Sequence, residues 1–322
     1  MKAQVLVTEE GPAGFQLQDV AEPVPAPEQV VVDVKSCGLC FPDLLMSRGQ
    51  YQLRPPLPFI PGTEVAGVVR SAPADSAFEA GDRVLVASMI GGFAETLTAA
   101  PQQLLPIPDE LTFDEAAAMG INFQTALFAL KLRAQTAPGE VVAVLGAAGG
   151  VGVASILVAK AMGAKVIAVV HRSGAEEMLR ELGADEVVPL ADGWKDRVLE
   201  LSDGGVDVVV DPVGGDVFDE ALRTVAPDGR YVVIGFAAGG IPTVKLNRVL
   251  FRNVSIVGAA WGEYIRRQPQ VPALLHDELV EMIQAGLRPP VNATYPLDDL
   301  PQALADLAEG RIRGKAVVKI AE

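Results

Sequence analysis

Cysteine and histidine are both scarce in this sequence, which holds two of each among its 322 residues. The cysteines, Cys37 and Cys40, are too few and too close to cross-link a chain of this length, so we expect no disulfide framework and a reducing compartment. A structural zinc site needs four ligands, and no second cysteine pair exists to complete one. The histidines, His171 and His276, do not lie beside Cys40 in the sequence. We therefore expect no catalytic zinc, and interpret the cysteines as small buried residues at a strand end.

Basic residues and long apolar runs are also few. Lysine and arginine number 26 against 41 acidic residues, and the net charge of −15 gives nucleic acid and anionic membranes little to attract. The sequence has no stretch of about 18 apolar residues, and it begins on an apolar alternation with no charged leader. We predict a soluble, cytoplasmic protein without nucleic acid or membrane partners.

Apolar residues, by contrast, make up half of the sequence, which is enough to fill two lobes. In the first hundred residues they form short β-type runs that glycine and proline interrupt. These runs occupy residues 5–8, 29–34, 65–69, 83–87 and 94–98. The pattern predicts an irregular, mostly antiparallel β lobe over residues 1–115.

From about Phe113 the pattern changes to wholly apolar runs that alternate with helical segments. The predicted strands span residues 141–145, 166–170, 206–210 and 231–234, and the predicted helices span residues 150–162, 175–182 and 218–225. Because strands buried on both faces are typical of parallel sheets, residues 116–255 are predicted to form a Rossmann-type, doubly wound α/β domain.

The end of the chain differs again. A strand is predicted at residues 255–257, helices at 273–285 and 301–308, and a last strand at 316–320. We expect residues 256–322 to return to the first lobe and complete it.

A glycine-rich turn, GAAGGVG at residues 146–152, joins the first apolar strand of this domain to a helix. A dinucleotide-binding fingerprint requires this order of strand, turn and helix. Gly149 would let the backbone approach a pyrophosphate, and Gly152 would allow close packing of the helix on the strand. The unpaired N–H groups of the helix N-terminus would face the negative charge. We predict that a dinucleotide binds to Ala147, which stands where the first glycine is usual, and to Gly149, Gly150, Val151 and Gly152. A turn that only reverses the chain is the alternative.

The end of the second strand indicates which nicotinamide cofactor binds. An acidic residue there would hydrogen-bond the ribose hydroxyls and repel a 2′-phosphate, but the sequence has His171, Arg172 and Ser173. Arg172 can pair with a phosphate, and Ser173 can donate a hydrogen bond to it. We therefore predict that these three residues bind NADPH in preference to NADH. The alternatives are a solvated Arg172 and competition from the acidic pair Glu176 and Glu177.

Further motifs are spread along the chain: CGLCFPD at residues 37–43, PGTEVAG at 61–67, GDRV at 81–84, GGFAE at 91–95, DPVGG at 211–215 and GAAWG at 258–262. With the glycine turn, they resemble the medium-chain dehydrogenase/reductase superfamily, and specifically its zinc-free NADPH:quinone oxidoreductase branch. The resemblance covers essentially the whole chain. It implies a GroES-like catalytic lobe built from both chain ends, a Rossmann lobe between them, a cleft at their junction and a homodimer formed through the cofactor lobes.

Two positions depart from the patterns of this superfamily. The zinc-dependent members carry histidine where this sequence has Thr63, and threonine does not replace imidazole as a zinc ligand. The quinone reductases usually carry asparagine at the position of Cys40. The resemblance therefore implies the fold more firmly than it implies any substrate contact of Cys40.

The resemblance also implies which residues surround the nicotinamide. It places Asn122, Gln124 and Thr125 near the ring, where amide and hydroxyl groups can hold the carboxamide and orient the ring. Others would line the cofactor and the cleft, with ordinary strand-end packing as the alternative: Gly235, Phe236 and Trp261.

Tyr51 is the candidate catalytic residue, because related enoyl-thioester reductases carry a proton-donating tyrosine at a similar position. A buried structural tyrosine is the alternative. We interpret the carboxylates of Asp43 and Glu64 as local supports of the lobe and not as an acid or a base.

The function that follows from these features is hydride transfer from NADPH to a quinone or a conjugated carbonyl, without a metal. One alternative is an enoyl-thioester reductase, for which Arg48 and Arg54 could provide an anion-binding patch. The other is an NADPH-binding sensor that has lost turnover, since a fold does not dictate a function.

Overall fold

The structure is a computed structural model that describes residues 1–171 and 174–321, so the predicted cofactor residues Arg172 and Ser173 lie outside the described residues. The chain divides into two compact units. The first comprises Met1–Ile121 and Arg288–Glu322, and the second comprises Asn122–Leu287. The division falls within helix α2 (Phe113–Leu127).

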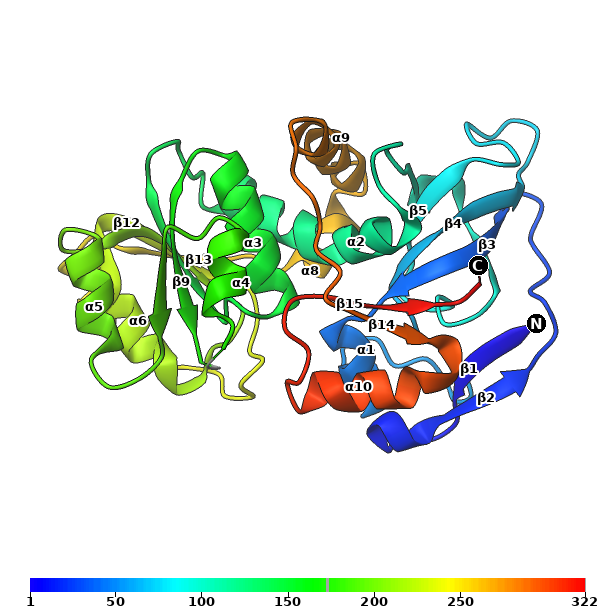
Figure 1. The fold of residues 1–322 in the computed structure, drawn as a ribbon, viewed down its shortest axis with the longest axis horizontal. Helices are drawn as coiled ribbons and strands as arrows, with labels where there is room; N and C mark the ends of the chain where they lie inside the picture. Colours follow the sequence, from blue (N-terminus) through cyan, green and yellow to red (C-terminus); the bar gives the residue numbers. More distant parts are fainter. Residues whose placement is uncertain (172–173, 322) are drawn as a thin grey trace. The chain divides into compact units, whose positions relative to one another are not determined.

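A mostly antiparallel sheet forms the framework of the first unit (Figure 1). Its described strands run in the order β14-β15-β3-β4-β5-β7, with β6 paired to β3, and only β14 and β15 pair in parallel. The strands are β3 (Val30–Gly38), β4 (Glu64–Ser71), β5 (Arg83–Ala87), β6 (Thr96–Ala99), β7 (Leu104–Pro106), β14 (Ala293–Pro296) and β15 (Ala316–Lys319). A separate antiparallel pair is formed by β1 (Lys2–Leu6) and β2 (Phe15–Asp19). The predicted antiparallel β lobe is confirmed.

The core of the first unit is built from both ends of the chain. The valines of β3 are buried together with leucines of α1 (Phe41–Ser47) and α10 (Leu300–Ala308). Valine is a frequent strand residue because its branched side chain packs well against the neighbours of a sheet. Strand β15 continues the sheet because its backbone pairs antiparallel with β3. Short helical segments complete the unit: η1 (Gly11–Gly14), η2 (Pro101–Gln103) and η5 (Leu297–Asp299).

The second unit contains a parallel sheet. Its described strands run in the order β10-β9-β8-β11-β12-β13, and every pair is parallel. They are β8 (Val141–Leu145), β9 (Lys165–Val170), β10 (Glu186–Pro189), β11 (Val206–Asp211), β12 (Val225–Val233) and β13 (Ser255–Gly258). This is the strand order of a Rossmann fold, so the prediction is confirmed, and the order reverses between β8 and β11.

Helices cover both faces of this sheet. In Figure 1, α3 (Gly150–Ala161) and α4 (Glu176–Glu181) lie on one side, and α5 (Trp194–Leu201) and α6 (Phe218–Thr224) lie on the other. The remaining helical segments are η3 (Phe128–Arg133, π-helical), η4 (Gly215–Val217), α7 (Leu246–Leu250), α8 (Trp261–Arg267) and α9 (Val271–Gln284). Among the described residues, no helix is both long and apolar enough to cross a membrane.

The boundary of the second unit differs from the predicted one. The sequence pattern ended the cofactor domain at residue 255, but the second unit continues to Leu287. The reason is that β13 forms the sixth strand of its sheet, while α8 and α9 pack beside η3. Phe128 and Trp261 bring their ring centroids within 5.2 Å, and Lys131 pairs with Glu278 at 2.5 Å. The segment that returns to the first unit is therefore shorter than predicted.

Candidate functional site

The glycine turn leaves the carboxyl end of β8 and enters α3. Gly146 has φ of 59°, in the left-handed region that suits glycine. The N–H of Gly149 donates to the Gly146 carbonyl oxygen at 2.9 Å, and the N–H of Ala147 donates to the Val169 carbonyl oxygen at 3.2 Å. The turn is thereby fixed to the end of β9, one strand away in the sheet. His171, which directly follows β9, is exposed.

The glycines of this turn have different surroundings. A Cβ on Gly152 would lie 2.3 Å from the Gly146 carbonyl oxygen, so this position must lack a side chain for α3 to approach the turn. A Cβ on Gly150 would lie 2.5 Å from Nδ2 of Asn122. A Cβ on Gly149 would meet only the Gly146 carbonyl oxygen, at 3.4 Å. Gly152 therefore serves packing, whereas Gly149 leaves open space beside the turn.

The first turn of α3 can bind an anion. By helix geometry, the N–H groups of Gly150, Val151 and Gly152 have no acceptor within the helix. The first turn of α3 contains no acidic residue, so its positive dipole end is not neutralised from within. A phosphate group close to Gly149 would accept these hydrogen bonds.

Two of the polar residues predicted near the nicotinamide lie together in α2. Asn122 and Thr125 are buried, and their spacing of three positions puts them on one helix face. Asn122 lies against Gly150, so the structure brings it together with the glycine turn. Gln124 has another contact, because its Nε2 donates to the Pro272 carbonyl oxygen at 3.4 Å.

The other predicted cofactor residues lie after the strands β12 and β13. Gly235 and Phe236 follow β12, and the Phe236 side chain is 41% exposed. Trp261 begins α8 and is 7% exposed, because it packs against Phe128. Phe236 is thus available to a ligand, whereas the indole of Trp261 is largely covered within its own unit.

Tyr51 belongs to the first unit. It follows α1 by four residues and is half-buried. The predicted cofactor residues belong to the second unit. Because Tyr51 and these residues belong to different units, the catalytic role of Tyr51 stays a prediction.

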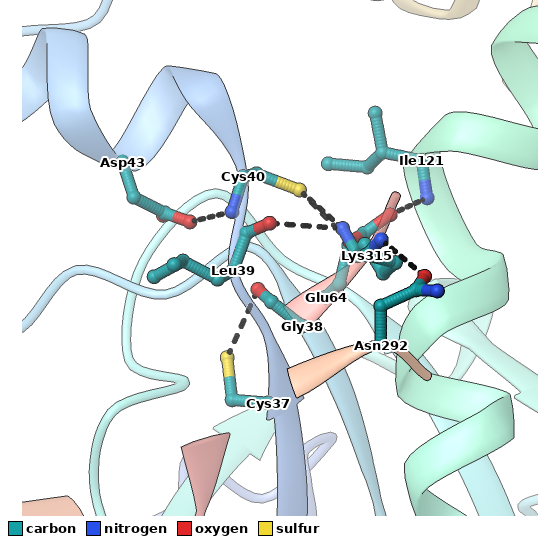
Figure 2. Close-up of polar contacts among 9 residues, drawn as sticks. All are labelled: Cys37, Gly38, Leu39, Cys40, Asp43, Glu64, Ile121, Asn292 and Lys315. Carbon is teal, nitrogen blue, oxygen red and sulfur yellow. Dashed lines mark hydrogen bonds and ion pairs between the residues drawn. The ribbon is translucent and has the colours of Figure 1, made fainter. Parts of the chain in front are cut away.

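A buried polar network lies in the first unit, where β3, β4, α2 and β15 meet (Figure 2). The ammonium of Lys315 donates to the Leu39 carbonyl oxygen at 3.1 Å, to Sγ of Cys40 at 3.2 Å and to Oε2 of Glu64. The Cys40 thiol donates to the same Glu64 oxygen at 2.8 Å, and Oε1 of Glu64 accepts the Ile121 N–H. One buried ion pair therefore joins four segments that are distant in the sequence.

The network keeps its lysine charged and its thiol neutral. Burial lowers the pKa of Lys315, but its contacts with Cys40 and Glu64 outweigh this effect and raise the pKa above its ordinary value. Burial, and then the negative charge of Glu64, raise the pKa of the Cys40 thiol. The Cys37 thiol, whose pKa burial also raises, points to the Gly38 carbonyl instead (Figure 2). Since the thiolate is the nucleophile, neither cysteine is set up as one.

Comparison with known proteins identifies the family of the chain. Residues 26–109 match the model of the alcohol dehydrogenase GroES-like domain, and residues 150–279 match that of zinc-binding dehydrogenases. Quinone oxidoreductase-like protein 2 of Rattus norvegicus is 38% identical over 94% of this chain and 88% of its own length. This chain belongs to the medium-chain dehydrogenase/reductase superfamily, in its quinone oxidoreductase branch.

Solved structures agree with this assignment. A probable oxidoreductase from Mycobacterium abscessus is 46% identical, with a TM-score of 0.93 over 99% of this chain and 98% of the other. The quinone oxidoreductase from Thermus thermophilus, described also as a complex with NADPH, is 36% identical, with a TM-score of 0.87 over 99% of this chain and all of its own. This medium-chain dehydrogenase/reductase is thus an oxidoreductase by family.

The sequence analysis of this superfamily member did not identify Lys315, which makes the ion pair in the buried network. Cys40 was interpreted as a small buried residue, and it is buried, but it also bonds to Glu64 and Lys315. The only local signal for Lys315 is a lysine directly before the buried strand β15. Thr63, at the position where zinc-dependent members carry histidine, is 1% exposed. The described residues contain no group of three or more His, Cys, Asp or Glu side chains arranged to hold a metal.

Asp43, which the sequence indicated as a local support, caps α1. Its Oδ2 accepts the Cys40 N–H at 2.9 Å, and it is fully buried. Burial raises the pKa of Asp43 from 3.8 to about 7; the hydrogen bond from the Cys40 N–H and the charge of Lys315 lower it by less, and the charge of Glu64 raises it further. The folded protein therefore binds this proton more tightly than the unfolded chain does.

This difference predicts a pH dependence that Asp43→Asn removes. The stabilisation from protonated Asp43 is complete below pH about 4 and is lost as the pH rises to about 7. Between pH 5 and pH 8 wild type should therefore lose about 2 kcal/mol more of its free energy of unfolding than Asp43→Asn does. Asparagine still accepts the capping hydrogen bond. Urea denaturation at both pH values measures the change, and equal losses in the two proteins would contradict the assignment.

Proposed function

We propose that this chain is an NADPH-dependent reductase that transfers a hydride to a quinone or a conjugated carbonyl without a metal. The observation that carries the proposal is the open space beside Gly149 in the glycine turn. The turn lies at the carboxyl end of β8, next to the point where the strand order reverses. The NADPH complex of the Thermus thermophilus relative supports the cofactor. The names of the relatives support the quinone as substrate.

The residues of the second unit fit this cofactor. The backbone at Gly149, Gly150 and Val151 would bind the pyrophosphate, because a phosphate there meets N–H groups beside the open space at Gly149, with the Asn122 amide next to Gly150. Ala147 and Gly152 would hold the turn close to α3. The predicted preference for NADPH depends on Arg172 and Ser173, next to the exposed His171.

The remaining proposed residues would place the ring. When bound, NADPH supplies the hydride. The buried amide of Asn122 and the hydroxyl of Thr125 would orient the carboxamide, since both lie on the face of α2 that carries the contact with Gly150. Gly235, Phe236 and Trp261 would exclude water from the ring.

Tyr51 would hold the proton that the reduced substrate takes up. We expect Tyr51→Phe to lower kcat by about a hundredfold while the KM for NADPH stays unchanged. Tyr295→Phe is the matched control, because it also removes a tyrosine hydroxyl from the first unit, one that donates to Asp306 at 2.7 Å. A Tyr51→Phe protein with normal kcat and lowered thermal stability would assign Tyr51 a structural role instead.

The proposed function is tested by following the consumption of NADPH by purified protein with a small quinone. Parallel reactions contain a 2-enoyl thioester in place of the quinone, or NADH in place of NADPH. Quinone-dependent loss of NADPH is the expected result. Turnover of the thioester alone would replace the proposal by an enoyl-thioester reductase, and cofactor binding without turnover of either would indicate a sensor.

We also propose a homodimer formed through the second unit. Among the described residues, β13 ends the sheet without a further strand partner. Large exposed apolar side chains lie close to it in the sequence: Ile241, Leu246, Leu250, Phe251 and Ile256. An unpaired strand edge and exposed apolar side chains are each typical of an association surface. Analytical ultracentrifugation measures the mass, and a monomer at micromolar concentration would contradict the proposal.

The cytoplasm is the compartment that fits the chemistry of the chain. Cys37 and Cys40 are both free thiols and both buried, as expected of a protein in a reducing compartment. Cell fractionation tests this placement.

A further inference from the structure

Asp211 ends β11, and the two oxygens of its buried carboxylate have different partners. Oδ2 accepts the hydroxyl of Tyr231 at 2.7 Å. Oδ1 accepts the N–H groups of Val213 at 2.8 Å and of Gly214 at 2.9 Å. Burial, and then the charge of Asp211, raise the pKa of Tyr231, so its hydroxyl remains a donor. A buried carboxylate is costly unless its oxygens accept such bonds, and here one oxygen serves the sheet while the other serves a loop.

The loop that Asp211 holds has an unusual backbone. Gly214 has φ of 63° and ψ of −151°, a conformation that is essentially restricted to glycine. Gly215 follows with φ of 67°. Such conformations persist only where their surroundings fix them, and they gather at functional sites. The hydrogen bonds from Val213 and Gly214 to Asp211 provide that fixation.

This loop, residues 212–215, is hydrogen-bonded to the loop after β12. The N–H of Ala237 donates to the Pro212 carbonyl oxygen at 3.2 Å, and that of Ala238 donates to the Val213 carbonyl oxygen at 2.9 Å. The N–H of Gly215 donates to the Gly240 carbonyl oxygen at 3.0 Å. Three backbone hydrogen bonds therefore join the two loops.

Residues 212–215 contact the glycine turn on one side and the proposed cofactor residue Phe236 on the other. A Cβ on Gly146 would lie 2.7 Å from Cγ2 of Val213, so this valine fills the side of the glycine turn. A Cβ on Gly214 would lie 2.8 Å from Cδ1 of Phe236, so the phenyl ring rests on this glycine. Strands β8 and β11 are neighbours at the reversal of the strand order, where ligands bind in sheets of this type.

We propose that Asp211 is a positioning residue for the cofactor: through Oδ1 it holds residues 212–215 between the glycine turn and Phe236, and so fixes the wall of the dinucleotide site. The inference rests on the proposed function, since the site is the one assigned there to NADPH. Asp211 would act on the cofactor only through the loop that it holds.

The test compares Asp211→Ala with Tyr231→Phe. Asp211→Ala removes all three hydrogen bonds of the buried carboxylate, whereas Tyr231→Phe removes only the bond to Oδ2 and leaves the two loop bonds in place. We expect Asp211→Ala to raise the Kd for NADPH by about tenfold or more, and Tyr231→Phe to raise it by less than about twofold, at similar losses of thermal stability. Titration of the nicotinamide fluorescence measures Kd, and thermal denaturation measures stability.

Equal Kd values in the two variants would overturn the inference, because they would show that the loop bonds are irrelevant to binding. If Asp211→Ala does not fold, Asp211→Asn replaces it. The amide oxygen of asparagine can accept the loop N–H groups but carries no charge, so the loop is held more weakly and the Kd for NADPH is expected to rise, by less than in Asp211→Ala. An unchanged Kd counts against the proposal. Wild type is titrated first. A wild-type protein that does not bind NADPH refutes the proposed function itself, whereas binding that is insensitive to Asp211 refutes only this inference.

Discussion

Replacement of Gly152 by alanine is expected to abolish detectable NADPH binding and to lower the free energy of unfolding by about 3 kcal/mol. The new Cβ would lie 2.3 Å from the Gly146 carbonyl oxygen and 2.7 Å from Cα of Ala147. Both are backbone atoms of the turn and cannot rotate aside, so α3 must move away from β8. The N–H groups at the start of α3 would move with it. Fluorescence titration and urea denaturation measure the two effects.

Gly149→Ala is the matched control within the same turn. Gly149 is extended, with φ of −90° and ψ of 168°, which alanine adopts without strain. Its Cβ would meet only the Gly146 carbonyl oxygen, at 3.4 Å. We expect its free energy of unfolding to stay within about 0.5 kcal/mol of wild type, while the methyl group weakens NADPH binding by occupying the open space beside the turn. Normal NADPH affinity in Gly152→Ala would show that the dinucleotide does not bind at this turn.

The parts of the fold that have a short-range cause could be predicted from the sequence. The strand, turn and helix around Gly149 were predicted as residues 141–145 and 150–162, and the structure has Val141–Leu145 and Gly150–Ala161. Wholly apolar runs also located β9 and β11 to within one residue at either end. These signals are local, because burial on both faces of a parallel strand requires apolar residues at every position.

Other elements lacked such a local signal. Strand β2 (Phe15–Asp19) buries only Phe15 and so lacks an alternating pattern, and α5 (Trp194–Leu201) is rich in charged residues, so neither was predicted. The extent of the second unit depends on α9, whose pairing with η3 is a contact between residues far apart in the sequence. An apolar period identifies a helix but does not say which sheet it joins.

The candidate site, like the fold, could be predicted from the sequence only in part. The glycines could be read from the sequence because each has a backbone reason, and Asn122 entered only through the family resemblance. The partnership of Glu64 with Lys315 spans 251 positions in the sequence, and the role of Asp211 depends on which loop its Oδ1 meets. Glu64 and Asp211 lie in motifs that the sequence analysis quoted, but the motifs do not name the partners of these residues, and Lys315 lies in no motif at all; a single buried charge is recognised only when its partner is known.

The second large effect is expected for Lys315→Met. The side chains of Lys315 and Glu64 are 4% and 0% exposed, so neutralising the lysine leaves a buried carboxylate without its cation. Breaking a buried ion pair from one side costs about 3 to 5 kcal/mol, and urea denaturation should show a loss of this size. Arg197→Met, which breaks the exposed pair with Glu200, is the control and should change the free energy of unfolding by less than about 1 kcal/mol.

The double variant Lys315→Met with Glu64→Gln separates the two explanations of such a loss. Glutamine keeps an oxygen for the Ile121 N–H, so the double variant has neither an unpaired charge nor an unpaired backbone donor. If the unpaired charge causes the loss, the double variant will be more stable than Lys315→Met alone. If the lost hydrogen bonds from the ammonium to Leu39 and Cys40 cause it, the losses will add. Additive losses would mean that the hydrogen bonds of the ammonium to Leu39 and Cys40 stabilise this part of the fold. Recovery in the double variant would mean that Lys315 is required to neutralise the buried charge of Glu64.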